Sequence, residues 1–164
     1  MSPACGFDSA PGDVVLPIYL DSAATQVILL PLRSLHLQGA VNGKHDCIGR
    51  YNAAGLDPAN SCLPDQAHPD FVSGAQADGF TLLEDADKVV IGALNETLCA
   101  LLTGNTAMYG SKDPTGLTVC KRDASLAIVF KGDWCAATNQ SASMGCADAL
   151  QMMATFAAQA VTVQ

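Results

Sequence analysis

Apolar and polar residues alternate in Arg33-Ser34-Leu35-His36-Leu37-Gln38-Gly39-Ala40-Val41, which is the pattern of a β-strand with one buried face. In an extended chain, Leu35, Leu37 and Gly39 fall on one face. Ser34, His36 and Gln38 fall on the opposite face. Residues 33–41 are therefore predicted to form a strand that is half exposed, and the protein is predicted to be built on a sheet.

The residues that precede this stretch supply two more predicted strands. Residues 26–30 form an apolar run that is predicted to be a buried strand ended by Pro31. Residues 13–20 are apolar and β-branched, but they contain Pro17. Because proline cannot donate to a strand ladder, residues 13–20 are predicted to form an edge strand or a strand broken by a bulge.

Residues 82–102 carry the strongest helix signal in the chain. Thr81 and Glu84 form the T-x-x-E pair that is typical of a capping box, and Gly104 supplies a stop signal. Apolar residues recur at intervals of three and four: Ala86, Val89, Val90, Ala93, Leu94, Leu98, Leu101 and Leu102. We expect one amphipathic helix over about 82–102. Residues 147–164 stay open, because their alanines favour a helix whereas the ending Val161-Thr162-Val163 favours a strand.

The chain has seven cysteines and no C-x-x-C motif, so zinc ribbons and thioredoxin-type redox motifs are not supported. Cysteines that are spread through loop-like sequence are typical of disulfides in an oxidising compartment. Pairing of nearest neighbours predicts the bridges Cys47–Cys62, Cys99–Cys120 and Cys135–Cys146. The first and the last would each contribute about 3 kcal/mol by closing a long loop. Cys5 is then left over, either unpaired or as a lipid-anchored cysteine near the N-terminus.

The composition limits the kinds of partner. Eight basic residues against 16 acidic residues give a net charge of −8, which argues against nucleic acid and anionic membranes as partners. No apolar stretch reaches the roughly 20 residues of a membrane span. The length of 164 residues fits a single domain, 1–164, with a flexible N-terminal segment of about 1–12.

No catalytic motif stands out, and no cofactor is implied. Calcium is the metal that the sequence favours most. The reason is that Asp57, Asp65 and Asp70 lie in one loop that is rich in aspartate and proline. A site built from His45, Cys47 and His68 is conceivable, but a disulfide at Cys47 would remove it. The simpler interpretation is that the aspartates form turns and caps and that the histidines are solvated.

Three stretches resemble segments of a known group of proteins: Asp46-Cys47-Ile48-Gly49-Arg50-Tyr51, residues 82–104 and Ile128-Val129-Phe130-Lys131-Gly132-Asp133-Trp134-Cys135. Together they resemble the uncharacterised secreted or lipoprotein-type proteins of myxobacteria. The resemblance implies an exported product and brings no catalytic residues.

We therefore expect an α+β fold, an antiparallel β-sandwich or curled sheet with one amphipathic helix and disulfide-stapled loops. The leading hypothesis is a secreted or cell-surface protein without enzymatic activity, which binds a protein partner or assembles with itself. One alternative is a small secreted hydrolase with an Asp/His site. Another is a calcium-dependent adhesin or carbohydrate binder that uses Asp57, Asp65 and Asp70.

Overall fold

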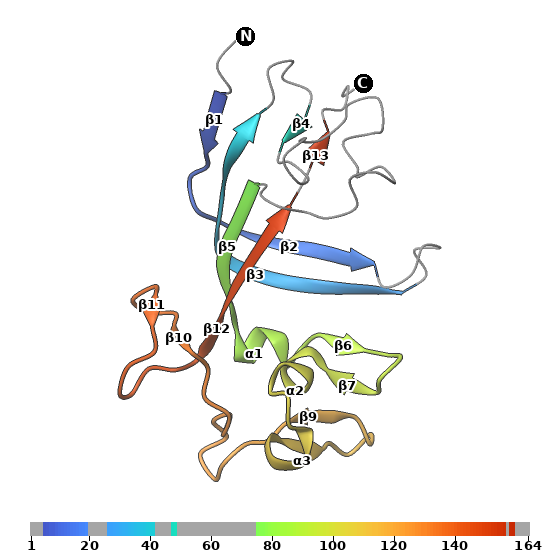
Figure 1. Cartoon of the computed structure of the whole chain (residues 1–164). Coiled ribbons are helices and arrows are strands. Elements are labelled where there is room, and N and C mark those ends of the chain that lie inside the picture. Colours follow the sequence, from blue (N-terminus) through green and yellow to red (C-terminus); the bar gives the residue numbers. More distant parts are fainter. Residues whose placement is uncertain (1–4, 20–25, 42–46, 49–74, 157, 160–164) are drawn as a thin grey trace. The chain divides into compact units, whose positions relative to one another are not determined.

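The computed structural model describes residues 5–19, 26–41, 47–48, 75–156 and 158–159 (Figure 1). The chain divides into two compact units. Unit 1 comprises Met1–Gly12, Leu35–Asp78 and Met153–Gln164, and unit 2 comprises Asp13–Ser34 and Gly79–Met152. Strands β3 (Val27–Val41), β5 (Ala75–Leu82) and β12 (Ala149–Phe156) contribute residues to both units.

The larger sheet is mostly antiparallel and follows the order β11-β10-β12-β5-β3-β4-β13, and β1 and β2 also pair with β3. The short strands of this sheet are β1 (Cys5–Asp8), β4 (Cys47–Ile48), β10 (Trp134–Cys135), β11 (Gln140–Ser141) and β13 (Ala158–Gln159), and β2 (Gly12–Tyr19) is longer. Strand β3 pairs with four other strands of this sheet, β1, β2, β4 and β5. The strand that the alternation in residues 33–41 predicts is thus confirmed as the second part of β3.

In unit 1, strand β1 lies antiparallel to the second half of β3. Phe7 is paired with Gly39 in this register. A Cβ atom at Gly39 would lie 2.6 Å from the Cβ of Ala75 and 3.0 Å from the ring of Phe7. Glycine is therefore required at this position, because β5 and the phenyl ring approach the backbone too closely for a side chain.

Ser34 interrupts β3 with a left-handed backbone conformation, φ 49°. Before it, even-numbered Leu30 and Leu32 are buried; after it, the odd-numbered Leu35 is buried, so the alternation shifts by one residue. The expectation that Pro31 ends a strand is wrong, because β3 continues through it to Val41. Proline is tolerated within a strand where no ladder bond needs its nitrogen.

Unit 2 contains a smaller sheet with the order β6-β7-β9-β8. Its strands are β6 (Val90–Ile91), β7 (Glu96–Thr97), β8 (Gly110–Lys112) and β9 (Thr118–Cys120), and its helices are α1 (Leu83–Ala86), α2 (Leu98–Leu102) and α3 (Thr106–Tyr109). The β6–β7 and β10–β11 hairpins end their turns with Asn95 and Asn139, which have φ of 52° and 51°. Asparagine tolerates this conformation better than most residues, which explains its place in both turns.

The prediction of one amphipathic helix over about 82–102 is wrong. Helix α1 ends at Ala86, a hairpin occupies residues 90–97, and a separate helix, α2, begins at Leu98. The run Val89-Val90-Ile91 favours a strand because its residues are β-branched, and Asn95 in the left-handed region closes the turn. Thr97, rather than Thr81, caps a helix, and its hydroxyl accepts from the backbone nitrogen of Ala100 at 3.2 Å.

The described part of the C-terminal segment, which the sequence leaves open between helix and strand, forms β12 and β13. The fold is thus confirmed at the level of mostly antiparallel strands, few short helices and two disulfides in the described residues. The β-sandwich arrangement is not confirmed.

Candidate functional site

Disulfides join Cys99 to Cys120 and Cys135 to Cys146, which are two of the pairs that nearest-neighbour pairing gives. The first ties α2 to the end of β9, with the Cα atoms 5.8 Å apart. The second closes the segment that contains the β10–β11 hairpin, with a Cα separation of 5.1 Å. Disulfides of this kind persist in oxidising compartments, so the chain belongs in a non-cytosolic one.

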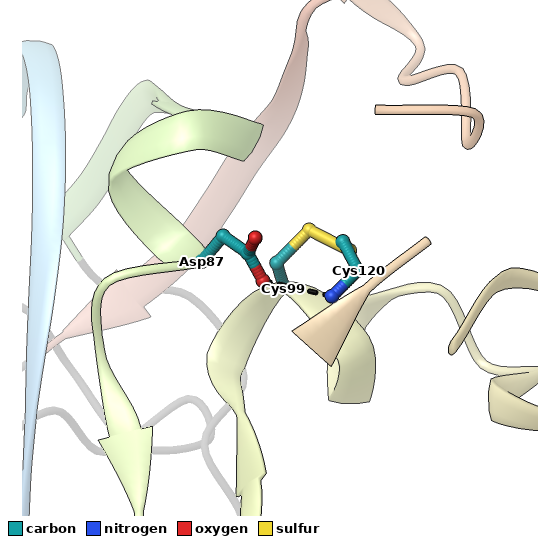
Figure 2. Close-up of side chains that lie close together, drawn as sticks. All are labelled: Asp87, Cys99 and Cys120. Carbon is teal, nitrogen blue, oxygen red and sulfur yellow. Dashed lines mark hydrogen bonds between the residues drawn. A yellow bond between two sulfur atoms is a disulfide. The ribbon is translucent and has the colours of Figure 1, made fainter. Parts of the chain in front are cut away.

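Asp87 is the polar centre of the region around the first bridge. One carboxylate oxygen accepts from the backbone nitrogen of Cys120 at 2.8 Å (Figure 2). The same oxygen accepts from the Thr97 hydroxyl at 2.9 Å. The other accepts from the guanidinium of Arg122 at 2.8 Å. Because the Asp87 side chain is only 7% exposed, these bonds are screened little by water. Arg122 also forms a paired contact with both oxygens of Glu84.

The grouping of Asp87 with Cys99 and Cys120 has the composition of a metal site, as has the grouping of Asp148 with Cys135 and Cys146. In both groupings the two sulfur atoms are bonded to each other. Since thiolates are the metal ligands among cysteine species, neither group holds a metal while its disulfide is intact. Both are parts of the structural framework.

Strand β2 and residues 27–34 of β3 pair as a two-stranded ribbon, which we call the β2–β3 ribbon (Figure 1). Its side chains are apolar but largely exposed. Val15 and Tyr19 are each 58% exposed, Leu29 is 51% exposed and Val27 is 46% exposed. Leu16 and Ile18 are also among the exposed large apolar residues. Large apolar side chains that are exposed together on one element indicate a candidate protein interaction site.

A groove of about 390 Å³ lies at the base of the β2–β3 ribbon, within unit 2. We call it the base groove. Its apolar walls include Val15, Leu29, Pro31 and Val89. Its polar end contains Asp13, Arg33 and Asp85.

The polar end of the base groove is a neutralised charge network. The guanidinium of Arg33 donates to Asp13 at 2.7 Å and to Asp85 at 2.8 Å, and Lys88 donates to Asp85 at 3.0 Å. The bond from Arg33 is the main cause that lowers the pKa of Asp13 and of Asp85, and the bond to Asp85 is the main cause that raises the pKa of Arg33. Asp13 also accepts from the backbone nitrogen of Ser34 at 3.0 Å, so the same network fixes the break in β3.

A second hollow in unit 2, of about 440 Å³, is bordered by Leu83, Phe130, Glu84 and Asp148 among others. Its carboxylates are already engaged, since Glu84 pairs with Arg122 and Asp148 accepts from the backbone nitrogen of Ala136 at 3.0 Å. The charged groups here therefore serve the fold, and no ligand class follows from them.

In unit 1, His36 lies between two carboxylates. Its Nε2 is 2.5 Å from Asp8 and its Nδ1 is 3.1 Å from Asp78. The contact with Asp8, followed by that with Asp78, raises the pKa of His36. Because both ring nitrogens have carboxylate partners, neither is free to take a proton from a substrate in this arrangement.

Several predicted site residues lie outside the described residues: the calcium candidates Asp57, Asp65 and Asp70, together with His45, Cys62 and His68. The bridge Cys47–Cys62 therefore stays a prediction. Cys5 and Cys47 are described only as members of β1 and β4.

Within the described ranges, no helix has the length and apolar character needed to cross a membrane. No family model, curated protein or solved structure matches the chain.

The residues of the β2–β3 ribbon and the base groove are those that the sequence interpretation missed. Residues 13–20 and 26–30 are correctly predicted as strands, but the prediction that residues 26–30 are buried is wrong, because Val27 and Leu29 are exposed. The sequence carries only weak signals that distinguish an exposed strand from a buried one. Pro17 indicates that β2 is an edge strand, and Asp13 and Arg33 place charges near the base of the ribbon. That these charges pair across 20 residues is visible only in the structure.

Proposed function

We propose that this chain is an exported, disulfide-stabilised protein without enzymatic activity, and that it assembles with copies of itself through the β2–β3 ribbon. The observation that carries the proposal is the exposure of Val15, Tyr19, Val27 and Leu29 on one two-stranded element. Covering these side chains with a partner stabilises the complex by roughly 25 cal/mol for each Å² of apolar surface removed from water.

A second copy is the occupant that fits this surface. The exposed part of the ribbon is apolar, and the charges of Asp13, Arg33 and Asp85 at its base are paired with one another. A second copy therefore meets little like charge at this place, even though the whole chain has a net charge of −8. Aromatic and large aliphatic side chains are also those that supply most binding energy at protein interfaces.

Export is supported by the two disulfides, which require an oxidising compartment. The hydrolase alternative stays a prediction: His36 has both nitrogens engaged by Asp8 and Asp78, and the other two histidines lie outside the described residues. The calcium-dependent adhesin or carbohydrate binder depends on Asp57, Asp65 and Asp70, which lie outside the described residues, and it stays a prediction.

Sedimentation velocity from micromolar to millimolar concentration tests the assembly. We expect the weight-average mass of the oxidised protein to rise with concentration. The substitution Leu29→Asp should weaken association at least about tenfold, because it places a charge in an apolar contact. The control Met144→Asp adds the same charge at a fully exposed apolar residue outside the ribbon and should leave association unchanged. A wild-type chain that remains monomeric at the highest concentration would overturn the proposal.

A further inference from the structure

We infer that the assembly is heterologous: the outer part of one β2–β3 ribbon, centred on Tyr19, enters the base groove of a second copy. This inference rests on the proposed function and names the mode of contact. It follows from the presence, on one unit of the same chain, of two apolar regions with different shapes and different residues.

The first region is the outer segment of the ribbon, formed by Ile18, Tyr19 and Val27. These side chains are 41%, 58% and 46% exposed, and none of them lines the base groove. The second region is the base groove itself, a hollow of about 390 Å³ with walls from Val15, Leu29, Pro31 and Val89. The two regions share an apolar character and are formed by different residues, so a side chain of one copy can enter the hollow of another.

The chemistry of Tyr19 matches the base groove. Its ring needs an apolar surface, which the walls provide, and a buried tyrosine hydroxyl needs a hydrogen-bond partner. Each carboxylate oxygen of Asp13 and Asp85 at the polar end accepts one hydrogen bond and has a second lone pair that can accept from that hydroxyl. The guanidinium of Arg33, held between the two carboxylates, offers a cationic plane on which an aromatic ring can stack.

Insertion of a side chain fits this surface better than addition of a strand. A strand edge joins another edge through rows of backbone hydrogen bonds. Pro17, in the middle of β2, has no N–H group to donate to such a row. The contact is therefore carried by side chains in the groove.

The symmetry of the assembly follows from this arrangement. When the outer segment of each copy enters the groove of the next, both surfaces of every interior copy are used in different contacts. Such a heterologous contact produces rings or open filaments, whereas an isologous contact stops at a dimer.

A mixing experiment on the full oxidised chain tests the inference. Tyr19→Ser removes the inserted side chain and leaves the groove intact, and Leu29→Asp disables the groove and leaves Tyr19 intact. Each variant alone should be monomeric at concentrations at which the wild type associates. An equimolar mixture should form a 1:1 dimer and stop there, because each dimer has one intact contact and no second pair of intact surfaces.

The controls are Met108→Ser and Met144→Asp, which change exposed apolar residues outside the ribbon and should leave wild-type assembly unaltered. Circular dichroism and thermal melts verify that all variants fold, and Leu29→Ser replaces Leu29→Asp if the charged variant does not.

The outcomes separate the two claims. A wild type that stops at a dimer, or a mixture that remains monomeric while the wild type associates, would overturn the heterologous mode and leave self-association standing. A wild type that remains monomeric would overturn both.

Discussion

The Arg122 guanidinium lies 2.8 Å from the Asp87 carboxylate, an ion pair between residues 35 positions apart in the chain. The Asp87 side chain is nearly buried, and its other oxygen accepts from the backbone of Cys120 and the hydroxyl of Thr97. One aspartate thus connects the end of α1 with β7 and β9. The contact lies beside the disulfide that joins Cys99 and Cys120.

Replacement of Asp87 by alanine should destabilise the protein by about 3 kcal/mol, because it leaves Arg122 and the Cys120 amide without their acceptor. The free energy of unfolding from denaturant titration measures this loss. Lys88→Ala, which removes an ion pair from a side chain that is 73% exposed, serves as the contrast and should cost less than about 1 kcal/mol. Equal losses in the two variants would contradict the role given to Asp87.

The substitution Thr81→Val should stabilise the protein by about 1 kcal/mol. The Thr81 hydroxyl is buried and has no hydrogen-bond partner among the described residues, and an unsatisfied polar group is costly in the interior. Thr97→Val is the matched contrast, since the Thr97 hydroxyl is also buried but has partners in Asp87 and Ala100. It should destabilise the protein. Thermal melts of both variants measure the difference, and a loss of stability in Thr81→Val would refute the argument.

Leu126→Gly should stabilise the protein by about 1 kcal/mol, because Leu126 has a left-handed backbone with φ 68°. Its side chain is 73% exposed, so little packing is lost. The turn that begins at Asp113 has the same hydrogen-bond pattern and already has glycine, Gly116, in the equivalent position with φ 87°. Chemical denaturation measures the gain, and Gly116→Leu should show the reverse change. A destabilised Leu126→Gly variant would contradict this account of the turn.

The stability of unit 1 should depend on pH through His36. Its pKa is raised above the ordinary 6.5, first by Asp8 and then by Asp78. The stabilisation is therefore complete below pH 6.5 and is lost as the pH rises through the raised pKa of the folded state. Titration of the His36 ring by NMR should give a pKa above 6.5, and Asp8→Asn should lower it. An unshifted value in the wild type would show that the contact with Asp8 does not persist in solution.

Disulfide pairing is checked by a thiol count. Cys99, Cys120, Cys135 and Cys146 should be unreactive toward alkylating reagents in denatured, unreduced protein and reactive after reduction. Mass spectrometry of the digested protein identifies each pair. Alkylation of these cysteines without reductant would remove the argument for export.

Local patterns predict some elements well and others poorly, for physical reasons. The alternation around His36 identifies part of β3, because a half-exposed strand has a period of two. Residues 82–102 fit a period of three to four but contain Val89-Val90-Ile91 and Asn95, and tertiary contacts made by Asp87 and Thr97 favour the hairpin. The exposure of Tyr19 and Leu29 is not encoded locally, since burial depends on what the rest of the chain covers.

Photo-crosslinking from position 19 shows whether Tyr19 of one copy enters the base groove of another. Tyr19→p-benzoylphenylalanine places a photoreactive ring where the insertion is inferred, and a mixture of isotopically light and heavy chains identifies bonds between copies. We expect mixed light–heavy crosslinks from position 19 to peptides that contain Leu29 or Val89. Crosslinks only within one chain, or only from position 19 to position 19 of another copy, would contradict the account.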